Sequence, residues 1–183
     1  MKRYLTPLLI IITSICLVAC DFDKPENENY LYNNEATSKR VKINIEEAKV
    51  LSDVAILNET VISISQLSQI KSNEYHVKKI SSKLKKDNLK IKRQLSDLAE
   101  KKIILLPNSI DETVINELLK IEENSFSETY LKKVKLILES EVAQLKYLSN
   151  ITNDVDFKVL TVKLLVTLQY NLNQIQNILK TNY

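Results

Sequence analysis

The carboxylates of this 183-residue chain and its single histidine do not have the spacing of a helical metal site. His76 is the only histidine. A di-iron site in a helical bundle uses carboxylates from several helices together with Glu-x-x-His pairs, because that spacing places both ligands on one side of a helix. No Glu-x-x-His occurs in the sequence. We therefore interpret His76 as an ordinary boundary residue near a helix start and predict no cofactor from the residues themselves.

Hydrolytic chemistry is not favoured either. A Ser-His-Asp set has no support around a single histidine, and a chain without glycine has neither a Gly-x-Ser-x-Gly elbow nor a phosphate-cradling loop. The carboxylate pairs Glu46/Glu47 and Glu139/Glu141 are one or two residues apart, and such neighbours do not face each other on a helix. The sequence therefore predicts a protein that is not an enzyme.

The start of the chain is typical of an exported bacterial lipoprotein. Lys2 and Arg3 precede an apolar run from Leu8 to Val18, which is shorter than the roughly 20 residues of a membrane span. The run ends in Leu17-Val18-Ala19-Cys20, which resembles a lipobox, where cleavage leaves a lipidated cysteine at the new N-terminus. We predict a signal peptide over residues 1–19 and a membrane anchor through lipid on Cys20. No thiol then remains for disulfide or metal chemistry.

The segment after Cys20 predicts a flexible tether and bears on the location of the protein in the bacterial cell envelope. Residues 20–40 are rich in Asn and acids, contain Pro25, and have no hydrophobic period, so we predict a flexible tether there. Asp21 resembles an inner-membrane retention signal of some Gram-negative groups, whereas acidic residues near the cysteine resemble a surface-export signal of others. We favour the outer membrane over the inner membrane, with the domain facing the periplasm or the cell surface.

The rest of the chain, residues 41–183, predicts one all-α domain. It has no glycine, and its only proline is Pro107, which disfavours a sheet protein with tight turns. Apolar residues recur at spacings of three and four, in stripes that run Val50–Ile64, Val77–Leu98, Val134–Leu145 and Leu164–Ile178. We predict long helices from about Glu46 to Lys71, Glu74 to Lys101, Ser125 onward and Asp154 onward. A short helix is expected after the capping-box pair Ser109 and Glu112, and a second such pair, Ser125 and Glu128, is expected to start the third long helix.

Four short pieces, in order, resemble the bacterial family called domain of unknown function 4142, a ferritin-like helical family of exported proteins. These pieces are ILNETVISISQLSQIKS, LSDLAEKKIILLPNSI, FSETYLKKV and LLVTLQYNLNQIQNIL. The resemblance covers about three quarters of the chain. It implies a ferritin-like antiparallel four-helix bundle with a short extra helix between the second and third long helices, and it raises the alternative of a metal-binding or redox protein.

The resemblance also implies inward histidines at three positions, and this chain has none of them. The corresponding residues are Asn88, Leu138 and Asn171. All three fall on the apolar stripes, so we expect Asn88 and Asn171 to be buried and to bond each other, Asp87, Glu59, backbone or water, because a buried unpaired amide costs about 1–3 kcal/mol. Glu59 matches a glutamate of the family's first-helix segment. It is a weak metal-ligand candidate, and we favour a core-edge carboxylate that bonds one of the two amides.

The charge of the sequence favours protein or cell-wall partners over nucleic acid. The chain has a net charge of +3, with both signs mixed along it and no basic block interleaved with aromatics, so nucleic acid is not a predicted partner. A weak attraction to anionic membrane or cell-wall surfaces is compatible with that charge. Our hypothesis is a non-enzymatic, lipid-anchored bundle that acts through protein or cell-wall contacts, and nothing in the sequence fixes its oligomeric state.

Overall fold

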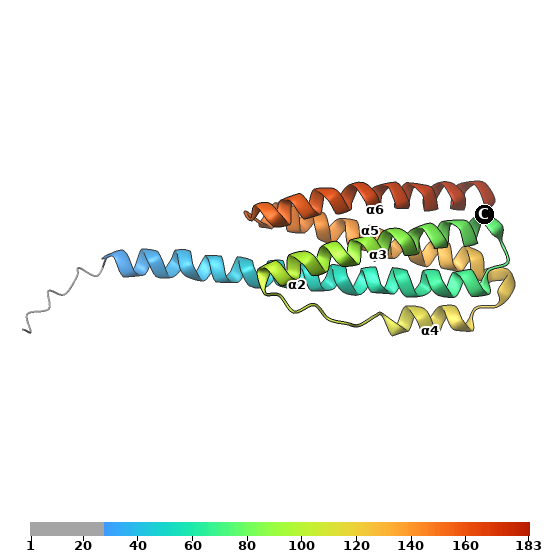
Figure 1. The fold of residues 1–183 in the computed structure, drawn as a ribbon, viewed down its shortest axis with the longest axis horizontal. Coiled ribbons are helices and arrows are strands. Elements are labelled where there is room, and N and C mark those ends of the chain that lie inside the picture. The colour runs from blue at the N-terminus through green and yellow to red at the C-terminus, as the bar shows by residue number, and fades with distance from the viewer. Residues whose placement is uncertain (1–27) are drawn as a thin grey trace, which may run out of the picture. The chain divides into compact units, whose positions relative to one another are not determined.

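The structure, a computed structural model, describes residues 28–183, which form five α-helices (Figure 1). The chain divides into two compact units, residues 1–39 and 40–183, and the bundle belongs to the second. The predicted all-α class, with four long helices and a short one between the second and third, is confirmed. The helices are α2 (Glu28–Lys71), α3 (Tyr75–Lys102), α4 (Glu112–Lys120), α5 (Glu123–Ile151) and α6 (Val155–Asn182).

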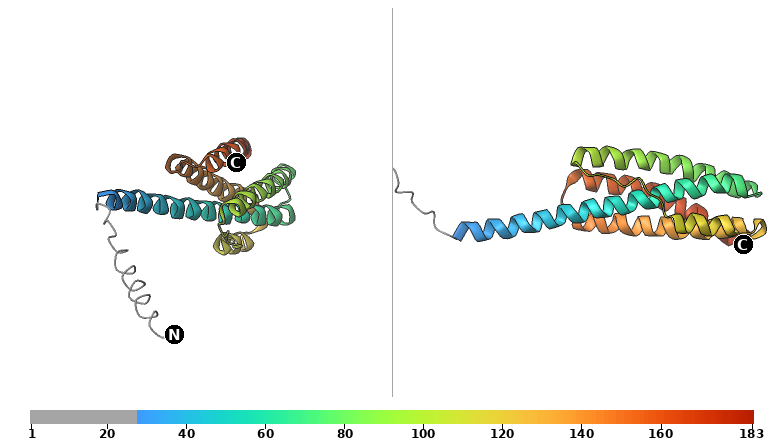
Figure 2. Two further views of the ribbon diagram at one scale, coloured as in Figure 1. Left: turned by 60° about the vertical axis from the view of Figure 1, so that its left-hand side comes forward. Right: turned by 90° about the horizontal axis from the view of Figure 1, so that it is seen from below.

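Contacts at both ends show that α3 and α6 are antiparallel neighbours. At one end Lys102, the last residue of α3, forms an ion pair with Asp154, the residue before α6. At the other end the hydroxyl of Tyr183, directly after α6, donates to Glu74, directly before α3. The two helices therefore run side by side over nearly their whole length (Figures 1 and 2).

Helices α2 and α5 form the second antiparallel pair across the bundle. Ser72, directly after α2, shares a hydrogen bond of 2.8 Å with Ser127 in the first turns of α5. Near the opposite end, the hydroxyl of Tyr147 in α5 donates to Glu46 in α2. Since α2–α3 and α5–α6 are each joined by a three-residue connection, every neighbouring pair in the bundle is antiparallel.

A single long connection between α3 and α5 makes this arrangement possible. After α3 the chain runs without helix from residue 104 to residue 111, and then α4 leads it to the start of α5 (Figure 1). Helices α3 and α5 consequently run in the same direction on opposite corners of the bundle. One crossover of this kind is the connection pattern of ferritin-like bundles.

The four apolar stripes of the sequence meet in the core. Val54, Leu84, Leu138 and Leu168, one from each long helix, are fully buried. Burying a side chain of this size contributes about 1.5–3 kcal/mol relative to leaving it in water, so the stripes dominate the stability of the bundle. Further buried residues on the same stripes are Val50, Val61, Ile64, Val77, Ile80, Ile91, Leu95, Leu98, Val134, Val142, Leu145, Leu164 and Ile175.

Helix α2 is, within the described residues, the one helix long and apolar enough to cross a membrane by length and composition alone. The stretch concerned is Thr37–Lys71, and more than half of its most apolar window is buried in the protein. Val50, Leu51 and Ile64 lie in the core of the bundle. We therefore assign α2 as a core helix.

Helix α2 also begins earlier than the sequence pattern predicted. Its first residue is Glu28, inside the segment 20–40 predicted as a tether, whereas the predicted start was Glu46. The amphipathic stripe begins only near Val50, but no proline or glycine follows Pro25 in this helix, and extending an existing helix costs little per residue. Apolar periodicity marks where a helix is buried, and it does not mark where the helix starts.

Both predicted capping boxes were wrong. Helix α4 is capped by Asp111, whose Oδ1 accepts from the backbone N–H groups of Thr113 at 3.0 Å and Val114 at 3.4 Å. Helix α5 begins at Glu123, so Ser125 already lies inside it. The Thr60 hydroxyl in α2 accepts from the backbone N–H of Asp111 at 2.9 Å, which places the carboxylate of that residue, and not Ser109, at the helix start.

Helix α3 ends in a left-handed residue that is not glycine. Ile103 has φ 57° and ψ 42°, and its N–H donates to the carbonyl of Glu100 at 3.2 Å. The next N–H, that of Ile104, donates to the carbonyl of Ala99 at 2.8 Å. This pair of bonds is the Schellman ending, which usually takes glycine at the left-handed position. A β-branched residue there is strained, and the strain follows directly from a chain without glycine.

Candidate functional site

Asn88 lies in the core, and its partner is a residue that the sequence analysis did not select. Its side-chain Oδ1 accepts from Asn58 Nδ2 on α2 at 2.7 Å, and its own Nδ2 donates to the carbonyl of Leu84 at 2.9 Å. Both asparagines are fully buried. Asn58 Oδ1 has no hydrogen-bond partner. The amide pair joins α2 to α3 and fills the position where the family's histidine is expected.

Asn171 lies in a second, separate polar cluster between α3 and α6. Its Oδ1 accepts from the Lys83 ammonium at 2.5 Å, and Lys83 also forms an ion pair of 2.7 Å with Asp87. The same ammonium lies 4.7 Å from the centre of the Tyr170 ring. Asn171 Nδ2 has no acceptor at hydrogen-bonding geometry. The expected bond between Asn88 and Asn171 is absent from the described contacts, and each amide serves a different helix pair.

The charges of this cluster fix the protonation of Asp87. Partial burial by itself raises the pKa of this carboxyl, but the Lys83 hydrogen bond and charge, together with the Asn171 amide and Lys90, lower the pKa below its ordinary value. Asp87 is therefore ionised at neutral pH. The cluster is an internal ion pair with one amide, and it stabilises the contact between α3 and α6.

Leu138, the third position at which the resemblance implies a histidine, is apolar and fully buried, and Glu141 follows it by three residues on α5. Glu141 is fully buried, and neither of its side-chain oxygens has a hydrogen-bond partner. Burial raises the pKa of Glu141 well above its ordinary value, so this side chain is a neutral carboxylic acid in the folded protein. The sequence analysis had dismissed Glu141 as half of a badly spaced pair. Its position three residues after Leu138 and four before Leu145 places it on the core stripe and could have identified it.

Glu59, the weak metal candidate, lines a pocket between α2, α3 and the crossover. Its carboxylate forms an ion pair with Lys92 on α3 and bonds neither Asn88 nor Asn171, so the expected amide bond is wrong. The pocket has a volume of about 170 Å³ and also contains Asn58, with its unpaired carbonyl oxygen. A cavity of this size with several polar side chains in its wall can hold ordered water or a small polar molecule. The other lining residues are Ala55, Leu95, Ser96, Leu106, Pro107 and Asn108.

The remaining ionisable groups of the described chain do not gather around a common point. Between residues 28 and 183, no three side chains of His, Cys, Asp and Glu converge as metal ligands. His76 Nε2 lies 3.0 Å from Glu74 Oε2, and its ring lies 6.2 Å from that of Tyr183, at the end of the bundle. Cys20, the predicted lipidation site, lies outside the described residues.

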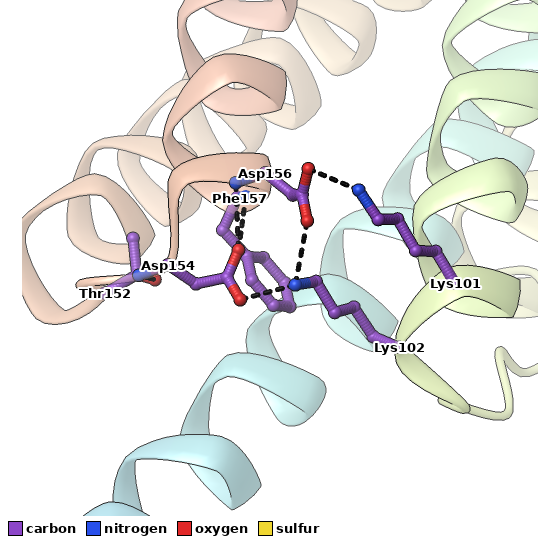
Figure 3. A network of polar contacts seen from close by, with 6 residues as sticks. All are labelled: Lys101, Lys102, Thr152, Asp154, Asp156 and Phe157. Carbon is purple, nitrogen blue, oxygen red and sulfur yellow. Dashed lines mark hydrogen bonds and ion pairs between the residues drawn. The ribbon is translucent and has the colours of Figure 1, made fainter.

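A cluster of ion pairs joins the end of α3 to the start of α6 (Figure 3). Lys101 lies 2.7 Å from Asp156, and Lys102 contacts both Asp156, at 2.9 Å, and Asp154. Asp154 also caps α6, because its Oδ1 accepts from the N–H of Asp156 at 2.8 Å. Hydrogen bonds to these two aspartates raise the pKa of Lys102, and the Lys102 ammonium lowers the pKa of Asp154. Every charge here has a partner, so the cluster has a structural role.

Helix α6 carries a second apolar row on the side opposite its core stripe. Val155, Val159, Val162 and Val166 follow one another at spacings of four, three and four, and we call them the α6 valine row. Their exposed fractions are 71%, 47%, 60% and 67%. Tyr170, 54% exposed, continues the row by one more turn. Helix α6 is thus apolar toward the core and apolar toward solvent, which a helix that only supports a bundle does not need.

Helix α3, the neighbour of α6, concentrates positive charge. It contains ten lysines and arginines against three acids, a net charge of +7, whereas the whole chain has +3. Lys79, Lys86, Lys90 and Arg93 are exposed and share one face of the helix, and we call them the α3 basic row. The sequence analysis treated the charges as evenly mixed because it counted them along the chain and not by helix.

A groove lies between α3 and α6 next to the α6 valine row, with Val159 in its wall. The groove has a volume of about 280 Å³ and is lined from α3 by Gln94, Asp97, Leu98 and Lys101 and from α6 by Asp156, Val159, Leu160 and Lys163. At the far end of the row, Lys83 of α3 lies over the ring of Tyr170. We call this surface, made of the α3 basic row, the groove and the α6 valine row, the α3–α6 face.

Comparison with known proteins identifies the family. The family model described as a domain of unknown function (DUF4142) matches residues 33–178, which is most of the chain. A search of curated proteins and a search of solved structures found no significant match. The matched region contains all three inward positions, Asn88, Leu138 and Asn171, and both rows of the α3–α6 face. This chain therefore belongs to the DUF4142 family, a family of helical domains of unknown function.

Proposed function

We propose that this protein is a lipid-anchored, non-enzymatic domain of the bacterial cell envelope that works through contacts made by its folded surface. The observation that carries the proposal is the α6 valine row. Four exposed valines on one helical face have no role in the core, and contiguous exposed apolar surface in a folded domain marks a contact site. The lipobox-like sequence at Cys20 supports an envelope location.

The interior polar groups are consistent with a structural role. The Asn58–Asn88 pair and the Lys83–Asn171 contact each join two helices, and Asn88 and Asn171 are amides at positions where the family resemblance implies histidines. Glu59 is neutralised by Lys92. These residues stabilise the bundle, and in this proposal the function depends on contacts of the exposed surface.

Two measurements in cells test this proposal. Cys20→Ser, expressed with the native signal sequence, should move the protein from the membrane fraction to the soluble fraction. A photo-crosslinking residue at Val162 should give adducts in the envelope that are absent when the same residue replaces Leu119, an exposed leucine of α4. An unchanged membrane fraction for Cys20→Ser would contradict the anchor, and equal crosslinking at both positions would contradict the contact site.

The metal-binding alternative is supported by one observation: Glu59 and Asn58, whose side-chain oxygen has no hydrogen-bond partner, line the same pocket. Titration of the purified chain with iron(II) or zinc tests it, with Glu59→Ala as the control. Binding at one metal per chain that is lost in Glu59→Ala would establish a metal site and overturn the purely contact-based function. Binding that is equal in both proteins would remove Glu59 as a ligand.

A further inference from the structure

The α3–α6 face combines features that suit one class of partner. The α6 valine row offers apolar side chains along about three turns of helix, and Tyr170 adds an amphipathic ring one turn further on. On the neighbouring helix α3 the basic row presents four cations, and the Lys102–Asp154 and Lys83–Asn171 contacts set a register in which three of them, Lys86, Lys90 and Arg93, lie level with the valines and Tyr170. Apolar side chains that enter the boundary between headgroups and acyl chains, flanked by lysines that reach phosphates, are the pattern of proteins that lie on anionic bilayers.

The charge distribution supports this orientation. Because α3 has a net charge of +7 and the whole chain +3, the rest of the chain has −4. The protein is therefore polarised, with α3 and its surroundings positive. Among the described side chains, Lys79, Lys86 and Arg93 form no ion pair, so their charges are available to an outside partner. Lys158 and Lys163 on α6 flank the valine row and add to the same field.

The same charges oppose a second copy of the chain as the occupant. A symmetric dimer places the same surface of both subunits together, so each α3 basic row would approach the other subunit's cations. Like charges at an interface oppose association. An anionic surface removes this repulsion and uses both rows at once.

We propose that the α3–α6 face binds the surface of an anionic phospholipid bilayer. The valine row lies against the headgroup boundary, and the basic row contacts lipid phosphates. This inference rests on the proposed function, in which an anchor at Cys20 keeps the domain close to a membrane. The anchor supplies attachment, and the face determines which side of the bundle is turned toward the lipid.

The chain contains no tryptophan, so one introduced tryptophan reports its own surroundings without background. The experiment uses the full lipidated chain carrying Val162→Trp, reconstituted on vesicles of phosphatidylcholine alone or mixed with phosphatidylglycerol. Flotation measures attachment, and tryptophan emission together with quenching by brominated lipid measures contact at α6. Leu119→Trp on α4, a similarly exposed position away from both rows, is the matched control.

We expect the emission of Val162→Trp to shift to shorter wavelength and to be quenched on anionic vesicles, with little change on neutral vesicles or at Leu119→Trp. High salt should reverse the shift. Substituting Lys79, Lys86, Lys90 and Arg93 with glutamine should weaken the contact by about fivefold per charge removed. The same four-charge change at Lys42, Lys49, Lys120 and Lys146, exposed on α2, α4 and α5, should leave it unchanged.

The outcomes separate this inference from the proposed function. Flotation on both vesicle types without an emission shift of Val162→Trp would contradict lipid binding by the α3–α6 face and would agree with the lipid anchor at Cys20. Flotation on anionic vesicles alone, lost at high salt, would support the face and contradict the anchor, and no flotation would overturn both. An emission shift of equal size on neutral vesicles would contradict anionic lipid as the partner of this face. A shift that grows with protein density and not with anionic lipid would also contradict it, and would identify another copy of the chain as the partner.

Discussion

Glu141 is a titratable group whose protonation must change when the protein unfolds. Its folded pKa is raised by burial above the ordinary value of 4.5, so the folded state keeps a proton that the unfolded chain releases above that pH. Stability therefore falls as pH rises from about 4.5 toward the folded pKa. The slope reaches at most about 1.4 kcal/mol per pH unit for one proton.

The substitution Glu141→Gln should remove this dependence. We expect the variant and the parent chain to differ little in free energy of unfolding at pH 4, and the variant to gain relative stability as pH rises above 4.5, until the folded pKa of Glu141 is reached. Urea unfolding at each pH measures the difference. Glu139→Gln, a partly exposed neighbour paired with Lys135 at 3.2 Å, should show no such trend. A parallel trend at both positions would show that Glu141 is not a neutral acid in the core.

The Asn58–Asn88 pair makes a second prediction at this scale. Asn88→Leu leaves the buried Asn58 amide without its acceptor, and we expect a loss of about 1–3 kcal/mol. Adding Asn58→Leu removes the stranded amide as well, so the double variant should recover most of that loss. Chemical unfolding of both single variants and the double variant gives the coupling energy. Simple addition of the two losses would contradict the hydrogen bond.

Residue-scale prediction from sequence succeeded for burial, and among the expected partners it was right for the backbone, since Asn88 donates to the carbonyl of Leu84, but it missed the side chains of Asn58 and Lys83. The period of three and four placed Asn88 and Asn171 on inward faces, and both are fully buried. The stripe gives the direction of a side chain from its own helix, but partner choice depends on the rotation and axial position of the facing helix. Asn58 and Lys83 therefore became visible as partners only when α2 and α6 were placed against α3.

At the scale of elements, the ending of α3 offers a stabilising change. Ile103 has the left-handed conformation, in which a β-branched side chain is strained and glycine is not. Ile103 is 95% exposed, so its side chain contributes little packing. We expect Ile103→Gly to raise stability by about 1 kcal/mol, because relief of roughly 1–2 kcal/mol of strain exceeds the entropy that glycine adds to the unfolded chain.

Thermal unfolding of Ile103→Gly and Leu105→Gly checks this prediction. Leu105 is 94% exposed and has no positive φ, so glycine there should give no gain and a small loss. Equal changes in both variants would show that the Schellman ending stores no strain. The difference between the two variants would also measure how much stability the chain loses by having isoleucine in place of glycine at a left-handed position.

Elements were predicted well in number and poorly at their starts. The four long helices follow from the apolar stripes because burial requires a regular period. The starts of α2, α4 and α5 depend on other contacts, and the position of Asp111 is set by Thr60, fifty-one residues earlier in the chain. Local capping patterns such as Ser109 with Glu112 cannot include a contact of that range.

At the scale of the whole molecule, Lys71 holds the crossover. Its ammonium, in the last turn of α2, donates to the carbonyls of Leu118, Leu119 and Ile121 at 3.3, 2.8 and 3.1 Å. These carbonyls end α4, where a cation is favourable. It also lies 5.2 Å from the centre of the Phe126 ring at the start of α5. One side chain thus connects α2, α4 and α5.

We expect Lys71→Met to loosen α4 while the four long helices persist. Hydrogen exchange measured by mass spectrometry should rise over residues 112–121 and remain low in the core of α3 and α6. Lys120→Met, which changes an exposed lysine of α4 itself, is the control and should change exchange little. Unchanged exchange over residues 112–121 in Lys71→Met would mean that α4 is held by its apolar contacts alone.

The two three-residue connections have a consequence for how the molecule assembles. They divide the bundle into two hairpins, α2–α3 and α5–α6, each of which can form from contacts close in sequence. Between the hairpins lie the polar contacts Ser65–Tyr130, Ser72–Ser127 and Lys83–Asn171. Apolar stripes tolerate a slip of one helical turn, about 5.4 Å, whereas such a slip would break all three contacts and strand the buried hydroxyls and the Asn171 amide. The polar residues between the hairpins therefore determine the register in which the hairpins dock, because registers shifted by one helical turn lose these hydrogen bonds.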